Sequence, residues 1–373
     1  MMRLRAPIAV TLSTLALPML ALPMLALPML ALATLAPPTL ALAAATTAAP
    51  ALAAPVSGPA RTPTSAQAAS GWLARQMVGG SHYVTVFDGV TYPDQGGTID
   101  AIFAFAAAST ANDYGARAIA WLERPSILSN YIGNGTTSSY AGATAKTALA
   151  AEVRGVNPAA FGGVNLIKRL AALLRPSGRY SDHSSFGDYS DAFSQSLAIM
   201  ALSRHVGAPG KAVNFLYASE CKNGGFPLYF AQKTCVSDTD STAMDVQALL
   251  AAGWKGAAAR GLAWLAHEQL RNGGLDATGG TRPNANTTGL AGAAFAAGRW
   301  LHHATLARDF LISLQVGCSG PSSERGAIDY DSTGFAVSTA VDATAQGILG
   351  LADISLAAVS SRGSQAGDPH LAC

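Results

Sequence analysis

A residue pair ending in leucine recurs along the chain at nearly constant spacing, and this period is the strongest pattern in the sequence. The pairs are Trp72-Leu73, Trp121-Leu122, Arg169-Leu170, Phe215-Leu216, Trp264-Leu265 and Phe310-Leu311. Successive pairs are separated by 46–49 residues. A fixed period of this length is typical of a repeat architecture, so the sequence predicts six structural units.

A second apolar marker stands ten residues after each leucine and follows a turn. The markers are Tyr83, Ile132, Tyr180, Phe226 and Leu275. The turns are clearest at 223–226 and 272–275, where Asn-Gly-Gly precedes the marker. In the sixth unit the same offset falls on Pro321, which indicates inserted residues.

Each unit contains two helical patterns of different character. The first has an apolar stripe and a polar face, as in 257–270, whereas the second is small and apolar nearly all round, as in 241–252. Second helices of this kind are expected near 98–108, 143–151, 194–205, 287–297 and 342–353. No run of alternating apolar and polar residues predicts a strand.

The contrast between the two helix types predicts an all-α fold. Helices that are apolar all round belong inside, so six hairpins predict an (α/α)6 toroid with twelve principal helices, the second helix of each pair lining the ring. An open solenoid is the alternative, although solenoids usually carry polar caps at both ends. The toroid is predicted to cover 71–359, followed by a C-terminal tail at 360–373.

The N-terminal part of the chain has the composition of an export signal. Arg3 and Arg5 precede a long apolar run, and residues 6–60 contain no charged residue. Proline at 18, 23 and 28 argues against a regular membrane-spanning helix. Residues 1–53 are therefore interpreted as a secretory signal that ends near Ala51-Leu52-Ala53, and 54–70 as a flexible linker. This predicts an extracellular protein with no stable membrane insertion.

The charge balance limits the kinds of partner that the sequence predicts, and the cysteines predict how the chain is cross-linked. The chain has 24 Lys and Arg against 22 Asp and Glu, so the numbers are equal once Arg3 and Arg5 are set aside. This balance predicts no positively charged surface for binding nucleic acid. Four cysteines in an exported chain predict disulfides, and we favour Cys221–Cys235 and Cys318–Cys373 among the three possible connectivities. No spacing typical of a metal site is present, so no metal and no cofactor are predicted.

The segment 237–245, Ser-Asp-Thr-Asp-Ser-Thr-Ala-Met-Asp, has the clearest chemical character. Together with the repeat length and the Gly-Gly turns, it resembles the terpenoid cyclase/prenyltransferase toroid superfamily, and within it secreted bacterial proteins with prenyltransferase/squalene-oxidase repeats. Class II cyclases of that superfamily carry an Asp-x-Asp-Asp-Thr-Ala motif whose middle acid protonates an alkene. Asp238, Asp240, Thr242 and Ala243 match this motif, and Ser241 replaces its third acid.

This resemblance implies a proton donor at Asp240 assisted by Asp238. Such an acid must be kept protonated by burial and neighbouring carboxylates. The alternative is that Asp238 caps the second helix while Asp240 interacts with the helix dipole. The predicted inner helices have few aromatic residues, and class II cyclases pair two such domains where this chain has room for one.

The loop 179–191 of the third unit is a second candidate site. Its polar and aromatic residues, Tyr180, His183, Asp188 and Tyr189, are candidates for ligand contacts, as is Asp245 at the end of the acidic segment. Carbohydrate-active (α/α)6 enzymes place residues of these types in such loops, although a solvated loop with Asp191 as a helix cap is the alternative. We therefore expect an unidentified small-molecule or glycan ligand at the mouth of the ring, with an enzyme using Asp240 as the second hypothesis.

Overall fold

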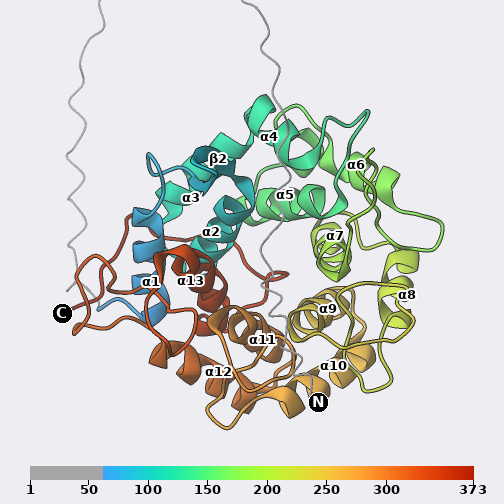
Figure 1. Ribbon diagram of the computed structural model, residues 1–373. Helices are drawn as coiled ribbons and strands as arrows, with labels where there is room; N and C mark the ends of the chain where they lie inside the picture. Colours follow the sequence, from blue (N-terminus) through green and yellow to red (C-terminus); the bar gives the residue numbers. More distant parts are fainter. Residues whose placement is uncertain (1–61) are drawn as a thin grey trace, which may run out of the picture. The chain divides into compact units, whose positions relative to one another are not determined.

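The computed structural model describes residues 62–373, which fold as one unit of paired helices (Figure 1). The inner helices are α2 (Gln95–Ala107), α5 (Ala141–Arg154), α7 (Ala192–His205), α9 (Thr239–Ala251), α11 (Ala285–Ala297) and α13 (Val337–Leu351). The outer helices are α1 (Ser65–Arg75), α3 (Asn112–Leu122), α4 (Pro125–Ile132), α6 (Leu166–Leu173), α8 (Gly210–Ala218), α10 (Lys255–Glu268) and α12 (Leu301–Ser313). A 3₁₀ turn, η1 (Pro158–Ala160), precedes α6.

The inner helices form a closed ring. Each packs against the next in chain order, and α13 packs against α2 to complete the circle. The outer ring closes as well, because the turn at Gly326 lies against the carbonyl of Ala68 in α1. Gly326 has a φ of +93°, and a Cβ there would stand 2.7 Å from that carbonyl oxygen, so the contact requires glycine. The predicted (α/α)6 toroid is confirmed, and the open solenoid is excluded.

The burial pattern agrees with the two helix types predicted from sequence. Nearly every residue of α9 from Ser241 to Leu249 is buried, whereas α10 buries only one side. The leucine of each pair is buried between the two layers, at 0–1% exposure, and Trp72 and Trp121 are buried beside it. The small residues of the inner helices let six helices pack around a narrow centre.

Several elements differ from the sequence prediction. Residues Tyr83–Phe87 (β1) and Val90–Asp94 (β2) form an antiparallel hairpin where no strand was predicted. Its turn is Asp88-Gly89, with φ of +48° and +75°, the signature of a tight two-residue hairpin. Among the described residues there are thirteen α-helices rather than twelve, because α4 replaces the turn before Ile132.

The ends of the toroid also differ from expectation. Helix α1 begins at Ser65, before the predicted start at 71, while the predicted signal at 1–53 lies outside the described residues. The sixth marker is Ile328, not Pro321, because 317–323 is an insertion that carries Cys318. No helix among residues 62–373 is long and apolar enough to cross a membrane.

The C-terminal segment, predicted as a tail from residue 360, is anchored to the ring. The backbone N–H of Ser361 donates to the carbonyl of Val153 in α5 at 3.0 Å, and that of Gln365 donates to the carbonyl of Ser109 at 3.0 Å. Cys318 and Cys373 form a disulfide with their Cα atoms 5.5 Å apart, and Cys221 pairs with Cys235 at the same Cα separation. These are the two pairings favoured from the sequence.

Candidate functional site at the mouth of the ring

A repeated hydrogen bond fixes the rotation of the inner helices. The backbone N–H of the second marker donates to a Thr or Gln side chain one turn into the inner helix. The pairs are Tyr83–Thr98 (3.0 Å), Tyr180–Gln195 (2.9 Å), Phe226–Thr242 (2.8 Å), Leu275–Thr288 (2.9 Å) and Ile328–Thr344 (2.9 Å). These anchor residues face the outer layer, and Thr144 of α5 stands at the corresponding place.

The anchors determine which residues face the ring axis. Each helical residue is rotated by about 100° from the last, so residues two places before or after an anchor point away from the outer layer. The first axial layer, near the helix N-termini, is Gly96, Gly142, Phe193, Asp240, Asn286 and Asp342. The second layer is Asp100, Lys146, Leu197, Met244, Leu290 and Gln346. All first-layer residues are at least partly accessible, and we call this end of the ring the mouth.

The two axial layers divide the mouth into an ionic side and an apolar side. Leu197, Met244 and Leu290 in the second layer are nearly buried, on α7, α9 and α11. On α2 and α5 the second layer carries an ion pair, with Lys146 Nζ 2.7 Å from Asp100 Oδ2. A ligand above these layers would therefore meet a charged sector and an apolar sector.

The ionic side contains three further polar groups around the Lys146–Asp100 ion pair. Burial raises the pKa of Asp100, and Lys146 opposes this rise. Burial alone would lower the pKa of Lys146, but Asp100 and the Tyr131 hydroxyl raise it, which favours the charged ammonium group. Burial, with Asp100 and Asp94 nearby, raises the pKa of Asp342 to about 6. Tyr131 is supplied by the additional helix α4, and Asp94 is the N-cap of α2.

Asp240 lies in the first axial layer, on the second residue of α9. Its side chain is half-buried, and its Oδ1 atom is shielded from solvent and has no hydrogen-bond partner. Burial, followed by the charge of Asp238, raises its pKa to about 7. The hydroxyl of Thr287 on α11 lies close enough to oppose this rise but does not reach full hydrogen-bond geometry. Asp240 is thus positioned to hold or release a proton near neutral pH.

The rest of the cyclase-like segment has structural contacts. Asp238 is the N-cap of α9 and accepts from the N–H of Ser241 at 2.7 Å. Thr242 is the repeat anchor, which accepts from Phe226 and donates to the carbonyl of Asp238. Asp191 and Asn284 cap α7 and α11 in the same way as Asp238 caps α9. Asp238 and Thr242 therefore have structural roles that recur in other units, whereas Asp240 has none.

Asp245 lies between two inner helices and not at the mouth. It is 0% exposed, accepts a hydrogen bond from Ser196 of α7, and leaves its Oδ2 atom unpartnered. Burial raises its pKa well above the ordinary value, while the hydrogen bond from Ser196 opposes the rise. A ligand contact by Asp245 remains a prediction that requires the α7–α9 interface to open.

The four candidate residues of the loop 179–191 have different surroundings. Tyr180 is 0% exposed and packs in the core, whereas Tyr189 is 67% exposed. His183 is exposed and pairs through its backbone with Ser139. Asp188 accepts from the N–H groups of Asp182 and Ser190 and lies 3.3 Å from Arg179, so it shapes the loop. Of these four side chains, only those of His183 and Tyr189 are exposed to solvent and have no structural hydrogen bond in the described part of the chain.

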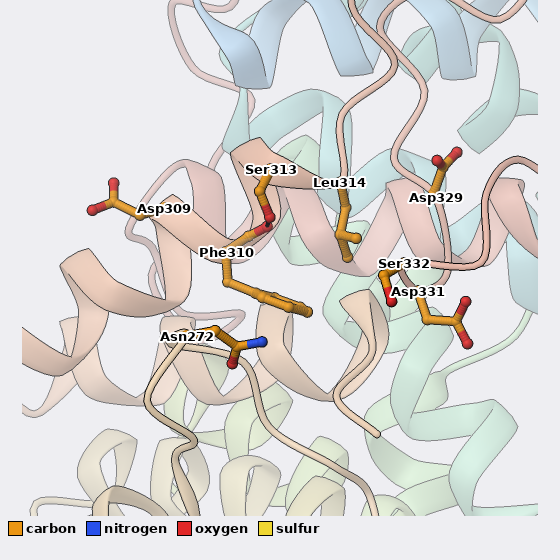
Figure 2. A pocket seen from close by; sticks show the side chains of 8 residues that line it. All are labelled: Asn272, Asp309, Phe310, Ser313, Leu314, Asp329, Asp331 and Ser332. Carbon is orange, nitrogen blue, oxygen red and sulfur yellow. Dashed lines mark hydrogen bonds between the residues drawn. The ribbon is translucent and has the colours of Figure 1, made fainter. Parts of the chain in front are cut away.

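A separate cleft of about 490 Å³ lies at the periphery, between α12 and the loop that leads to α13 (Figure 2). In Figure 2 the ring of Phe310 lies between Asp309 on one side and Asp329 and Asp331 on the other. Asn272, Ser313, Leu314 and Ser332 complete the lining. None of these residues belongs to the axial layers.

The residues that sequence reasoning missed are Asp100, Lys146, Asn286 and Asp342. They come from different units and form no local motif, so only their common distance of two residues from an anchor could have revealed them. In residues 62–373 no group of three or more His, Cys, Asp or Glu side chains is arranged to hold a metal ion. The prediction of no cofactor stays a prediction.

No family model and no curated protein sequence matches this chain. Solved structures match it in fold. A protein from Actinoplanes shares 16% identity and covers 78% of this chain and 98% of its own, with a TM-score of 0.57. The type II terpene cyclase MstE from Scytonema shares 13% identity over 77% and 96%, with a TM-score of 0.56. Unsaturated glucuronyl hydrolase from Bacillus sp. GL1 shares 10% identity over 77% and 95%, with a TM-score of 0.53. At these identities the similarity shows the toroid fold alone, which agrees with the resemblance inferred from the sequence.

Proposed function

We propose that this protein binds a small or extended ligand at the mouth of the ring, in contact with the axial residues of α9, α11 and α13. The observation that supports this most is the first axial layer, where Asp240, Asn286 and Asp342 occupy the same position in three successive units. Residues at this position do not hold the repeat together, because the neighbouring anchors and caps do so. Asp240 and Asn286 are partly buried and each has an oxygen atom without a hydrogen-bond partner, whereas Asp342 is exposed. Polar groups of the first kind are typical of binding sites.

Export is part of the proposal. The apolar, uncharged segment before residue 61 and the two disulfides are both typical of extracellular proteins. The ligand would then be one that the protein meets outside the cell.

Acid catalysis by Asp240 is the second proposed function. A carboxyl whose pKa is raised to about 7 by burial can donate a proton at neutral pH. Structural neighbours that bind a prenyl substrate or act on a glycosaminoglycan have the same fold, and they lend the enzyme hypothesis support by analogy only.

The test is to block the mouth. Gly96 lies in the first layer, and a Cβ there would meet only ordinary contacts, the nearest being 3.6 Å from Asp94. Gly96→Trp should fill the mouth without straining α2. The matched control is Gly256→Trp on the outer helix α10, where a Cβ would meet nothing within 4 Å.

The readout is native mass spectrometry of protein purified from culture supernatant. We expect a co-purified small molecule on the wild-type protein and on Gly256→Trp, and its loss from Gly96→Trp. A ligand that stays bound to Gly96→Trp would place the site elsewhere, for instance in the cleft around Phe310.

A further inference from the structure

Three solvent-shielded oxygen atoms without hydrogen-bond partners belong to residues in the first turns of the adjacent helices α9 and α11, whose contact we call the α9–α11 seam. They are Asp240 Oδ1, Asn286 Oδ1 and Thr287 Oγ1. Thr287 is 1% exposed, so its hydroxyl cannot be satisfied by bulk water in the usual way. Buried polar atoms are normally hydrogen-bonded. The Thr287 hydroxyl lies close enough to the Asp240 carboxyl to lower its pKa, but it does not reach hydrogen-bond geometry, and its lone pairs and the Asn286 oxygen remain without a donor.

The three atoms share one chemical property, because all of them can accept a hydrogen bond. A carboxylate oxygen and an amide oxygen are pure acceptors, and the hydroxyl oxygen has two lone pairs. The missing partner must therefore supply several donors at once. An ammonium group has three donors and no acceptor, and it also compensates the charge of Asp240.

The surrounding charges favour a cation over an anion. Asp238 and Asp276 both lie near enough to Asp240 to affect its ionisation, and Lys146 across the mouth is already paired with Asp100. Arg282 is the basic group beside Tyr330, and it is exposed. An anionic head group would meet these carboxylates with no free axial cation to offset them.

An aromatic ring completes the site. The carbonyl of Tyr330 accepts from the N–H of Ala285 at 2.8 Å, which fixes Tyr330 at the start of α11. Its ring is 38% exposed and lies near enough to Asp240 for the carboxyl to affect the ionisation of its hydroxyl. Aromatic faces attract ammonium groups, so the ring adds to the attraction of Asp240.

We propose that the α9–α11 seam binds a primary ammonium group, held by Asp240, Asn286 and Thr287 beside the ring of Tyr330. This inference deepens the proposed function, since it names the chemical class of ligand for the same mouth. The ammonium group could belong to an alkylamine or to an amino sugar. A planar guanidinium fits less well, because its donors form a fixed fork whereas these acceptors come from three separate side chains.

The experiment compares matched probes by ligand-observed NMR titration. The alkyl arm uses n-butylammonium, n-butanol and butyrate, and the sugar arm uses glucosamine and glucose. We expect the amine in at least one arm to bind about tenfold or more tightly than its neutral counterpart, as a charge-assisted hydrogen bond to a carboxylate implies. The arm with the tighter amine identifies the source of the ammonium group.

Variants locate the binding. Asp240→Asn should weaken n-butylammonium binding by about tenfold or more, and Thr287→Val by a few-fold, whereas Thr287→Ser should retain it within about twofold. Asp309→Asn removes an exposed carboxyl of the peripheral cleft and should leave the affinity for n-butylammonium unchanged. Circular dichroism of each variant establishes that it is folded before the titration.

Affinity for n-butylammonium should also rise between pH 5 and pH 8.5 as Asp240 ionises, since the probe stays protonated over this range. Equal binding of the charged and neutral probes, no binding of any probe, or an unchanged Asp240→Asn variant would overturn the ammonium site. The Gly96→Trp experiment is independent of these results. If a ligand of another class co-purified with the wild-type protein and was lost from Gly96→Trp, the ammonium site would be wrong but the proposed function would still hold.

Discussion

The carboxylate of Asp182 accepts a hydrogen bond of 2.7 Å from the backbone N–H of Ala141, the first residue of α5. In the following units a backbone carbonyl of the next loop does the same. Leu228 accepts from Ala192, and Tyr330 accepts from Ala285. At α5, α7 and α11 the loop of the next unit therefore satisfies the first N–H of the inner helix, so that these units interlock around the mouth. Asp182, in a loop that sequence analysis considered for ligand binding, substitutes for a carbonyl in this arrangement.

Replacing Asp182 tests the interlock. Asp182→Ala leaves the N–H of Ala141 without its acceptor and should lower the free energy of unfolding by about 1–2 kcal/mol, as the loss of a helix cap does. Denaturant unfolding followed by circular dichroism measures this. Asp182→Asn keeps an acceptor oxygen at the same place, so its free energy of unfolding should fall by less than that of Asp182→Ala. An Asp182→Ala variant as stable as the wild type would show that the bond contributes nothing.

The repeat anchor gives a second prediction. Thr242→Val preserves the shape of the side chain but removes the acceptor for Phe226 N–H, which is buried. We expect a loss of about 1–3 kcal/mol because a buried donor is left unsatisfied. Thr242→Ser keeps the hydroxyl and should recover most of the stability in the same unfolding assay. Equal stability of the two variants would argue against the anchor.

The two disulfides should differ in their contributions. Cys221–Cys235 closes a loop with a sequence separation of 14 and Cys318–Cys373 one with a separation of 55. By loop entropy, removing them as Cys→Ala pairs should cost about 3 and about 4 kcal/mol. Peptide mapping should recover both pairs, and a free thiol in the unreduced, denatured protein would contradict this assignment.

Stability should depend on pH through the axial carboxyls. The pKa of Asp240 is raised to about 7 and that of Asp342 to about 6 in the folded protein, above the ordinary value of 3.8. The folded state therefore binds these protons more tightly than the unfolded state, and their contribution is lost as pH rises from about 4 to about 7.

Asp240→Asn removes one of these groups. Relative to the wild type, it should be more stable at pH 8 by roughly 1–3 kcal/mol and gain little at pH 4, where the wild-type carboxyl is protonated. Thermal unfolding at both pH values makes the comparison. A variant whose difference from the wild type is the same at pH 4 and pH 8 would show that Asp240 ionises normally.

The period and the contrast between the two helix types were sufficient to predict the toroid, because burial of six apolar helices leaves few other arrangements. The hairpin at 83–94 was missed since its exposed strands, with Val84 and Val86 on the surface, lack the usual alternation. Its Asp88-Gly89 turn was the available signal. The insertion before Ile328 displaced the last marker, so a fixed offset selected Pro321 in its place.

The candidate site was only partly predictable. Asp240 was found through a local motif, although Asp238 and Thr242 belong to that motif for structural reasons. Asp100 and Lys146 are 46 residues apart, and their ion pair follows from ring closure and from the rotation of α2 and α5. Such pairs become visible in the sequence only after the anchor positions of the repeat are known.

A crystal structure of the protein purified from culture supernatant tests the central claim most directly. We predict ligand density over the first axial layer, within hydrogen-bond distance of Asp240 and Asn286, and none in the cleft around Phe310. Density confined to that peripheral cleft, with the axial carboxyls contacting only protein atoms, would contradict the account.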